Sequence, residues 1–390
     1  MKLNKILLLI NIFLLQSYLI RFDIGPYPSN LQEVLMGLNA LAFLGTTNLK
    51  KIIEGFKKHW IISILISLAA LSTVIVDIQN GLDFIRHSKF LLFASILSFI
   101  FLETFKSEDE KAFGLKIMGL GALCFGLFSV IYNLLGYNIS HDQRLLGPLD
   151  SAVYLAYYLT PFFLFFLFNF FEQKTRSSLI YSALLGLLIF ATRSMGAIGG
   201  SLVIISVYLI QTKDLLRKRN TKILLTFVIV LTFAAIFYTK ILPTINTEYS
   251  SLDERGQIWA TSMELLQNPK NLLSGVGFGQ FEFHYIEKVK TVLGHEPLDF
   301  KVLQPHNIFL LFIFNFGILG LFFLAYLIGR ISSVVLKFDT RRAGSPIKLI
   351  CAYIMLYFFI HGLIDTPFFK NDILVLIILF SSLGLEKEQA

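Results

Sequence analysis

The chain reads Ser251-Leu-Asp-Glu-Arg-Gly-Gln-Ile-Trp259 at the start of its only long polar interval. This interval passes through Gly275-Val-Gly-Phe-Gly279 and reaches Pro305-His306-Asn307, after which an apolar segment begins that carries Gly317 and Gly320. Elsewhere, apolar runs alternate with short basic loops. The contrast predicts one membrane domain, residues 1–390, with a single polar insertion at residues 244–305.

Apolar residues make up 55% of the 390 residues and charged residues only 15%, whereas soluble domains have about 45–50% and about 25%. Recurrent apolar runs are typical of helices that cross a bilayer, because a helix satisfies its own backbone hydrogen bonds. We therefore expect an all-α polytopic membrane protein with about twelve transmembrane helices. The expected spans lie near residues 5–20, 31–47, 60–78, 89–104, 115–135, 151–171, 178–192, 197–211, 222–243, 306–329, 346–363 and 371–385.

The formal net charge of +8 would fit a partner such as nucleic acid, but the distribution of the charges argues against one. Residues 244–305 hold five basic and eight acidic residues, so the insertion is net negative. The excess of Lys and Arg lies in short loops on one side of the expected spans, where it sets orientation. Both termini are therefore expected in the cytoplasm and the insertion outside. The other side keeps few cations besides those of the insertion: Arg21, Arg86, Lys89, Arg144, Arg193 and Lys370.

The insertion should begin with a helix. Ser251 and Glu254 form a capping-box pattern, and Asn268-Pro269 should end the helix. Arg255, Trp259 and Ser262 then lie on one face. The glycine-rich run after this helix is expected to be a turn rather than a phosphate cradle, because no strand precedes it.

Three arginines on the expected outer side have uncharged or acidic surroundings: Arg144, Arg193 and Arg255. A guanidinium group is permanently charged and matches phosphate oxygens in a fork, so a lipid diphosphate on the outer leaflet is a natural ligand. The alternative is contact with lipid headgroups, or pairing with a nearby acid such as Asp142 or Glu254.

His306 is the sharpest candidate for a catalytic residue. Histidine accepts a proton near neutral pH, and an attacking sugar hydroxyl needs such a base or a group that positions it. Pro305 fixes the entry into the following helix, so His306 could instead cap that helix together with Asn307.

His361 and Asp365 are four residues apart at the outer end of an expected span. They could bind a metal, support His306 or close the helix end. Two residues are a weak metal signal, because zinc sites usually have three or four protein ligands. We expect a metal-independent reaction without a cofactor.

These motifs together resemble the O-antigen ligase and polymerase superfamily. The matching segments are Arg144-Leu-Leu-Gly147, Arg255-Gly-Gln-Ile-Trp259, Asn268-Pro269, Gly275-Val-Gly-Phe-Gly-Gln-Phe281, and His306-Asn307 followed after nine residues by Gly317 and then by Gly320. The chain departs from the family pattern after Gly147, where it reads Pro148-Leu-Asp, and at Thr192-Arg-Ser194, which matches the usual Ser-Arg-Gly only in part.

The resemblance implies a GT-C-like glycosyltransferase of the bacterial plasma (inner) membrane, whose donor is a glycan on undecaprenyl diphosphate. Arg144 and Arg255, and with a weaker match Arg193, would bind the diphosphate, and His306 would activate or position the acceptor hydroxyl. The supporting residues would be Asn307, Trp259, Gly317, Gly320, His361 and Asp365.

A ligase would transfer the glycan en bloc to lipid A–core, whereas a polymerase would add it to another lipid-linked repeat. The motifs slightly favour the ligase. A flippase or transporter is the more remote alternative, because transporters carry charge near the membrane midplane. Here the expected spans are nearly free of central charge and the unusual residues lie at the outer face. The expected partners are thus the lipid-linked donor, a glycan acceptor and the bilayer, and not nucleic acid.

Overall fold

Most of the chain folds into apolar helices. The computed structural model describes residues 2–25, 27–138, 144–212, 251–299, 302–337, 345–366 and 368–386. The elements up to residue 212 are α1 (Lys2–Phe13), the 3-10 helix η1 (Leu15–Leu19), β1 (Arg21–Ile24), β2 (Tyr27–Asn30), α2 (Leu31–Leu44), α3 (Leu49–Lys58), α4 (Trp60–Ile75), α5 (Gly81–Thr104), α6 (Glu108–Leu134), α7 (Ala152–Gln173), α8 (Arg176–Ala191) and α9 (Met195–Thr212). They are followed by α12 (Ser251–Leu266), α13 (Pro269–Ser274), α14 (Phe281–Leu293), α15 (Ile308–Lys337), α16 (Pro346–His361) and α17 (Asn371–Gly384).

Each expected span coincides with a helix, apart from residues 222–243, which lie outside the described residues. By length and composition, α5, α6, α7 and α15 could cross a membrane, and α3 with α4 could form a fifth span that is bent by 88°. The remaining apolar helices of the described residues have at most 18 residues, fewer than the roughly 20 that a bilayer of about 30 Å needs. The apolar helices indicate a membrane protein, while twelve spans and the GT-C-like arrangement remain predictions.

One short segment departs from the all-helical expectation. Residues 21–30 form an antiparallel hairpin in which Arg21 pairs with Asn30. Gly25 supplies a φ of +61° in the connecting turn, a region that glycine enters without a Cβ clash. Asn30 then begins α2, because its side chain accepts a hydrogen bond from the backbone of Glu33.

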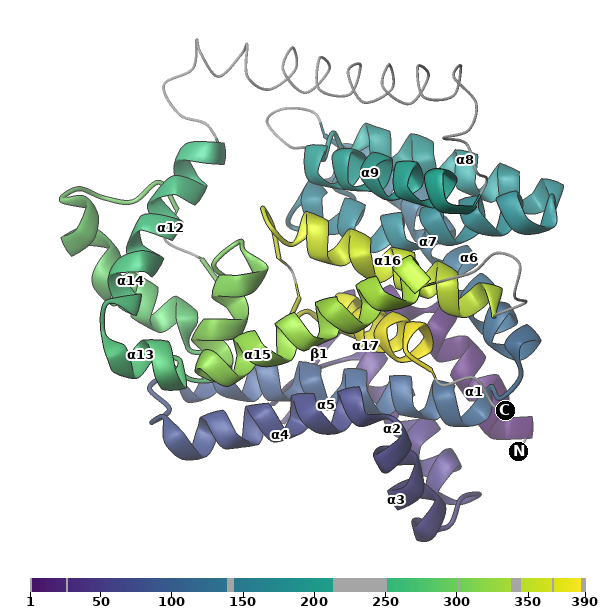
Figure 1. Ribbon diagram of the computed structural model, residues 1–390, viewed down its shortest axis with the longest axis horizontal. Coiled ribbons are helices and arrows are strands. Elements are labelled where there is room, and N and C mark those ends of the chain that lie inside the picture. The colour runs from purple at the N-terminus through teal and green to yellow at the C-terminus, as the bar shows by residue number, and fades with distance from the viewer. Residues whose placement is uncertain are drawn as a thin grey trace.

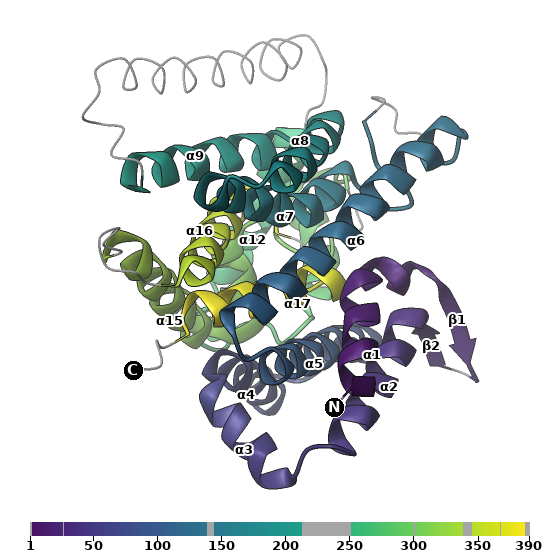
Figure 2. The same ribbon diagram turned by 90° about the vertical axis from the view of Figure 1, so that its right-hand side faces the viewer.

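The helices stack in three tiers (Figure 1), and the tiers are also visible after a quarter turn (Figure 2). Helices α7, α8 and α9 form one tier, α15, α16 and α17 lie in the middle, and α4 and α5 form the opposite tier. Helix α17 in the middle tier is enclosed by its neighbours, since almost every one of its residues is buried. The insertion helices α12, α13 and α14 gather at one end of the stack, beside the start of α15.

The insertion is anchored where α15 is interrupted. Gly317 has a φ of +62° and a ψ of −154° inside this helix, and a Cβ there would overlap the carbonyl of Leu273. Two hydrogen bonds fix the turn after α13: the N–H of Val276 donates to the carbonyl of Phe314 at 2.8 Å, and the N–H of Gly279 donates to the side chain of Asn315 at 2.8 Å. The turn after α13 therefore packs against α15 at the point where Gly317 interrupts that helix.

The glycine-rich run is a turn, as predicted. Gly275, Gly277 and Gly279 all have positive φ values, of 77°, 106° and 73°. The element before them is the short helix α13, not the strand that a phosphate cradle would need.

Candidate functional site

Two segments that are far apart in the sequence run side by side at the end of the stack where the insertion lies. One leads from the insertion into α15, and the other joins α16 to α17. Four contacts join them in antiparallel order: Ile308 N to Gly362 O (2.7 Å), Asn307 Nδ2 to Leu363 O (3.0 Å), His306 Nδ1 to Asp365 Oδ1 (2.8 Å) and Gln304 Nε2 to Phe369 O (3.5 Å). These paired segments form the base of the candidate site.

His306 does not cap α15. That role belongs to Asn307, whose side-chain oxygen accepts hydrogen bonds from the backbone N–H groups of Phe309 and Leu310. His306 has a φ of +49°, which is uncommon for a residue other than glycine and is held only by well-determined surroundings. Its ring points to Asp365, and the side chain keeps 27% of its surface exposed. The capping alternative for His306 is therefore wrong.

Asp365 joins the two strongest sequence candidates. One carboxylate oxygen contacts Nδ1 of His306 at 2.8 Å, and the other contacts Nη2 of Arg255 at 3.1 Å. The side chain is only 6% exposed. Burial raises the pKa of this carboxyl, but the hydrogen bond and charge of His306 and the charge of Arg255 outweigh burial and lower the pKa to about 2. The carboxylate is thus ionised at neutral pH.

Helix α12 reaches both paired segments from the face predicted for it. Arg255 in its first turn contacts Asp365, and one turn later Nε1 of Trp259 donates to the carbonyl of Pro305 at 3.1 Å. Ser262, on the same face, is fully buried. The helix therefore fixes the backbone next to His306 while it holds a guanidinium group at the carboxylate.

The arrangement can move a proton. When Nδ1–H of His306 donates to Asp365, the neutral ring carries its lone pair on Nε2. The carboxylate holds the ring in that tautomer and stabilises the imidazolium that forms when Nε2 takes a proton. Arg255 adds a partly exposed cation, which suits a phosphoryl group beside the base.

His361 lies apart from this group. Its Nδ1 is 2.7 Å from the hydroxyl of Tyr357, and its ring lies 4.3 Å from that of Tyr157. Of the three roles expected for His361 and Asp365, the structure shows Asp365 in contact with His306. It also shows the two residues closing the end of α16, where the N–H of Asp365 donates to the carbonyl of His361 at 3.1 Å. Within the described ranges, no three His, Cys, Asp or Glu side chains come together as a metal site would require.

The other two candidate arginines, Arg144 and Arg193, lie on backbone segments that meet. The N–H of Leu145 donates to the carbonyl of Ala191 at 3.0 Å, which brings the segments of Arg144 and Arg193 together. Three residues after Arg193, Gly196 packs directly against His361, because a Cβ on Gly196 would lie only 2.5 Å from the ring of His361. The segment of Arg193 therefore packs beside the turn that leads to Asp365.

The sequence model of the O-antigen ligase family matches residues 180–325. Residues 180–325 belong to the O-antigen ligase family. No curated protein matches the chain. The O-antigen ligase domain includes Arg193, Arg255 and His306, whereas Arg144 and Asp365 lie outside the matched residues. The carboxylate that completes the site is thus supplied from beyond the family domain.

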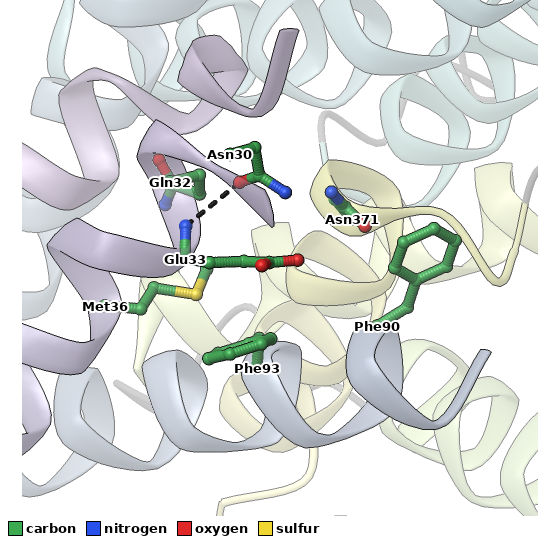
Figure 3. Close-up of a pocket in the computed structure, with 7 residues that line it drawn as sticks. All are labelled: Asn30, Gln32, Glu33, Met36, Phe90, Phe93 and Asn371. Atoms are coloured by element: carbon green, nitrogen blue, oxygen red, sulfur yellow. Dashed lines mark hydrogen bonds between the residues drawn. The ribbon is translucent and has the colours of Figure 1, made fainter. Parts of the chain in front are cut away.

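A separate, small hollow lies between α2, α5 and the start of α17 (Figure 3). Its lining residues are Asn30, Gln32, Glu33, Met36, Phe90, Phe93 and Asn371. Glu33 is already paired there, at 3.0 Å from Lys89. None of the residues that contact Asp365 lines this hollow, so it is distinct from the candidate site.

Proposed function

We propose that this chain is an O-antigen ligase-type glycosyltransferase. It transfers a glycan en bloc from undecaprenyl diphosphate to a sugar hydroxyl of an acceptor such as lipid A–core, at the outer face of the bacterial plasma membrane. The observation that carries the proposal is the contact of one buried carboxylate, Asp365, with both His306 and Arg255.

In the proposed reaction, the acceptor oxygen attacks the anomeric carbon of the donor sugar. The bond from that carbon to the diphosphate oxygen breaks, and its electron pair stays on the leaving undecaprenyl diphosphate. Nε2 of His306 takes the proton of the acceptor hydroxyl, and Asp365 stabilises the imidazolium. Arg255 binds the diphosphate, where negative charge develops.

Arg144 and Arg193 would add donors to the same diphosphate, because their segments meet each other and pack beside the turn that leads to Asp365. The insertion at residues 244–305 would then lie outside the cytoplasm, with α12 above the donor. We expect the reaction to proceed without a metal or cofactor, since His306 supplies the base and the arginines supply the positive charge.

A repeat-unit polymerase is the alternative within the family. Its chemistry at His306 would be the same, and only the acceptor would differ. A flippase or transporter is more remote, because the three contacting side chains lie at helix ends or in connecting segments and not at the middle of a span.

Purified protein should be mixed with the lipid-linked glycan and either lipid A–core or a second lipid-linked repeat, with and without a chelator. Transfer to lipid A–core supports the ligase, and transfer only to the second repeat supports the polymerase. Transfer that stops with the chelator would contradict a metal-independent reaction. If neither acceptor receives the glycan and the protein instead moves the lipid-linked donor across the membrane of vesicles, the proposal of a glycosyltransferase is refuted.

A further inference from the structure

Lys370 is a cation near the candidate site, and no carboxylate of the described residues forms an ion pair with it. Its Nζ lies 4.1 Å from the ring centroid of Tyr154 and 5.7 Å from that of Tyr18. Within the described ranges, no hydrogen bond or ion pair joins this ammonium group to another residue. The nearest acid in the sequence, Asp372, instead accepts a hydrogen bond from Gln16 at 2.6 Å. The ammonium is held by two aromatic faces.

The cation belongs to the same paired segments as the candidate site. Phe369, which precedes Lys370, accepts a hydrogen bond from Gln304, two residues before His306. Tyr154 lies within electrostatic range of Asp365. Lys370 and Tyr154 are both only partly buried, so a ligand can reach them.

The surroundings of Lys370 are unusually rich in polar atoms that need partners. Buried atoms without a hydrogen-bond partner among the described residues include the Tyr18 hydroxyl, Gln16 Oε1 and Asp372 Oδ1. Buried polar atoms are normally satisfied by protein, water or ligand. Burial lowers the pKa of Lys370, while Asp372 and Asp150 act in the opposite direction. An anion at this position would stabilise the charged ammonium.

We propose that Lys370, held on the ring of Tyr154, binds a phosphoryl group of a substrate at a second subsite beside His306 and Asp365. The inference rests on the proposed function and extends it. The phosphoryl group is either part of the donor diphosphate or a phosphate on the acceptor sugar. Arg255 and Lys370 would then both bind charged groups of the reacting pair.

The first test measures binding without transfer. The amines of the purified full-length protein are reductively methylated with and without inorganic pyrophosphate, and the modified peptides are quantified by mass spectrometry. We expect pyrophosphate to slow the modification of Lys370 at least threefold. Lys89, which is paired with Glu33 at 3.0 Å, is the control and should not change. Equal modification of Lys370 under both conditions would overturn the proposal.

A lipid headgroup is the other source of an anion for an outward lysine. The same labelling in nanodiscs distinguishes it. If anionic phosphatidylglycerol protects Lys370 and pyrophosphate does not, Lys370 is a membrane anchor and the proposal is wrong. Because neither labelling arm depends on transfer, protection in a protein that transfers no glycan would refute the proposed function and leave the subsite intact.

The second test separates the two phosphoryl sources. Lys370→Met keeps the apolar stem and removes the charge, and it should raise a KM at least tenfold while Lys370→Arg retains most activity. A rise in the donor KM assigns the subsite to the diphosphate, and a rise in the acceptor KM assigns it to the acceptor. Lys89→Met is the matched control. Unchanged KM values for both substrates in Lys370→Met would refute the subsite.

Discussion

Asp365 contacts Arg255 and His306 across sequence separations of 110 and 59 residues. Sequence reasoning identified all three side chains from their types and positions, but left Asp365 with three possible roles. Spacing along one helix shows which residues share a face, yet it does not show which loop lies opposite. The choice between metal ligand, helix end and partner of His306 therefore needed the tertiary contact.

His306→Ala should abolish transfer by removing the proposed base. General acid–base catalysis contributes about 100-fold to 10,000-fold, so the initial rate should fall by at least about 100-fold. The measurement is in-vitro transfer by variants purified in equal amount. His295→Ala removes an exposed histidine of the same insertion and should leave the rate unchanged. A His306→Ala rate within a few-fold of the wild type would remove His306 from the mechanism.

Asp365→Asn should lower both activity and stability. The pKa of Asp365 in the fold is about 2, below its reference value of 3.8, so the ionised carboxylate stabilises the fold above pH 3.8 and this contribution falls as the pH drops toward 2. At pH 7 it amounts to about 2 kcal/mol. Thermal unfolding in detergent should therefore show a difference in melting temperature between wild type and variant that becomes smaller from pH 7 to pH 3. A difference in melting temperature that does not change with pH would contradict an ionised Asp365 paired with His306 and Arg255.

At the scale of elements, the parts of the insertion with local signals were predictable. Helix α12 spans Ser251–Leu266 and ends before Asn268-Pro269, because proline and its capping neighbour stop a helix wherever they occur. The hairpin at residues 21–30 was not predicted. Its two strands have four residues each, too few for an alternating pattern to stand out between two apolar runs.

The glycine spacing also has an element-scale explanation that sequence alone did not supply. Gly317 interrupts α15, where a Cβ would overlap the carbonyl of Leu273. Gly275 on the opposing turn also lacks room for a Cβ, which would lie 2.5 Å from the carbonyl oxygen of Phe314. Two backbones thus approach closely without side chains between them. The pattern holds the insertion, and with it Arg255, in position over His306.

Gly317→Ala should therefore damage the site indirectly. The Cβ of the alanine would overlap the carbonyl of Leu273, and the alanine would have to adopt a φ of +62°. Together these effects should lower the free energy of unfolding by about 3 kcal/mol. The matched control is Gly329→Ala in the same helix, where a Cβ meets nothing within 4 Å and alanine should stabilise by about 0.5–1 kcal/mol. Thermal unfolding in detergent measures both. Equal melting temperatures for the two variants would contradict the docking role of Gly317.

At the scale of the whole molecule, the positions of the apolar helices were predictable, but not how many cross the bilayer. Hydropathy locates α2, α8 and α17, yet they have 14, 16 and 14 residues, and α17 is buried almost completely by its neighbours. A short apolar helix can be enclosed by other helices as well as by lipid. Sequence hydrophobicity is the same in both cases, so the spans cannot be counted from it alone.

Orientation can be tested without counting spans, because it depends on where Lys and Arg gather in short loops. After Cys124 and Cys351 are replaced by serine, one cysteine is introduced at an exposed position, either Lys290→Cys in α14 or Lys174→Cys between α7 and α8. In spheroplasts, a membrane-impermeant maleimide should label Lys290→Cys at once and Lys174→Cys only after permeabilisation. The opposite order would place the insertion in the cytoplasm, where no lipid-linked donor of the outer leaflet could reach His306.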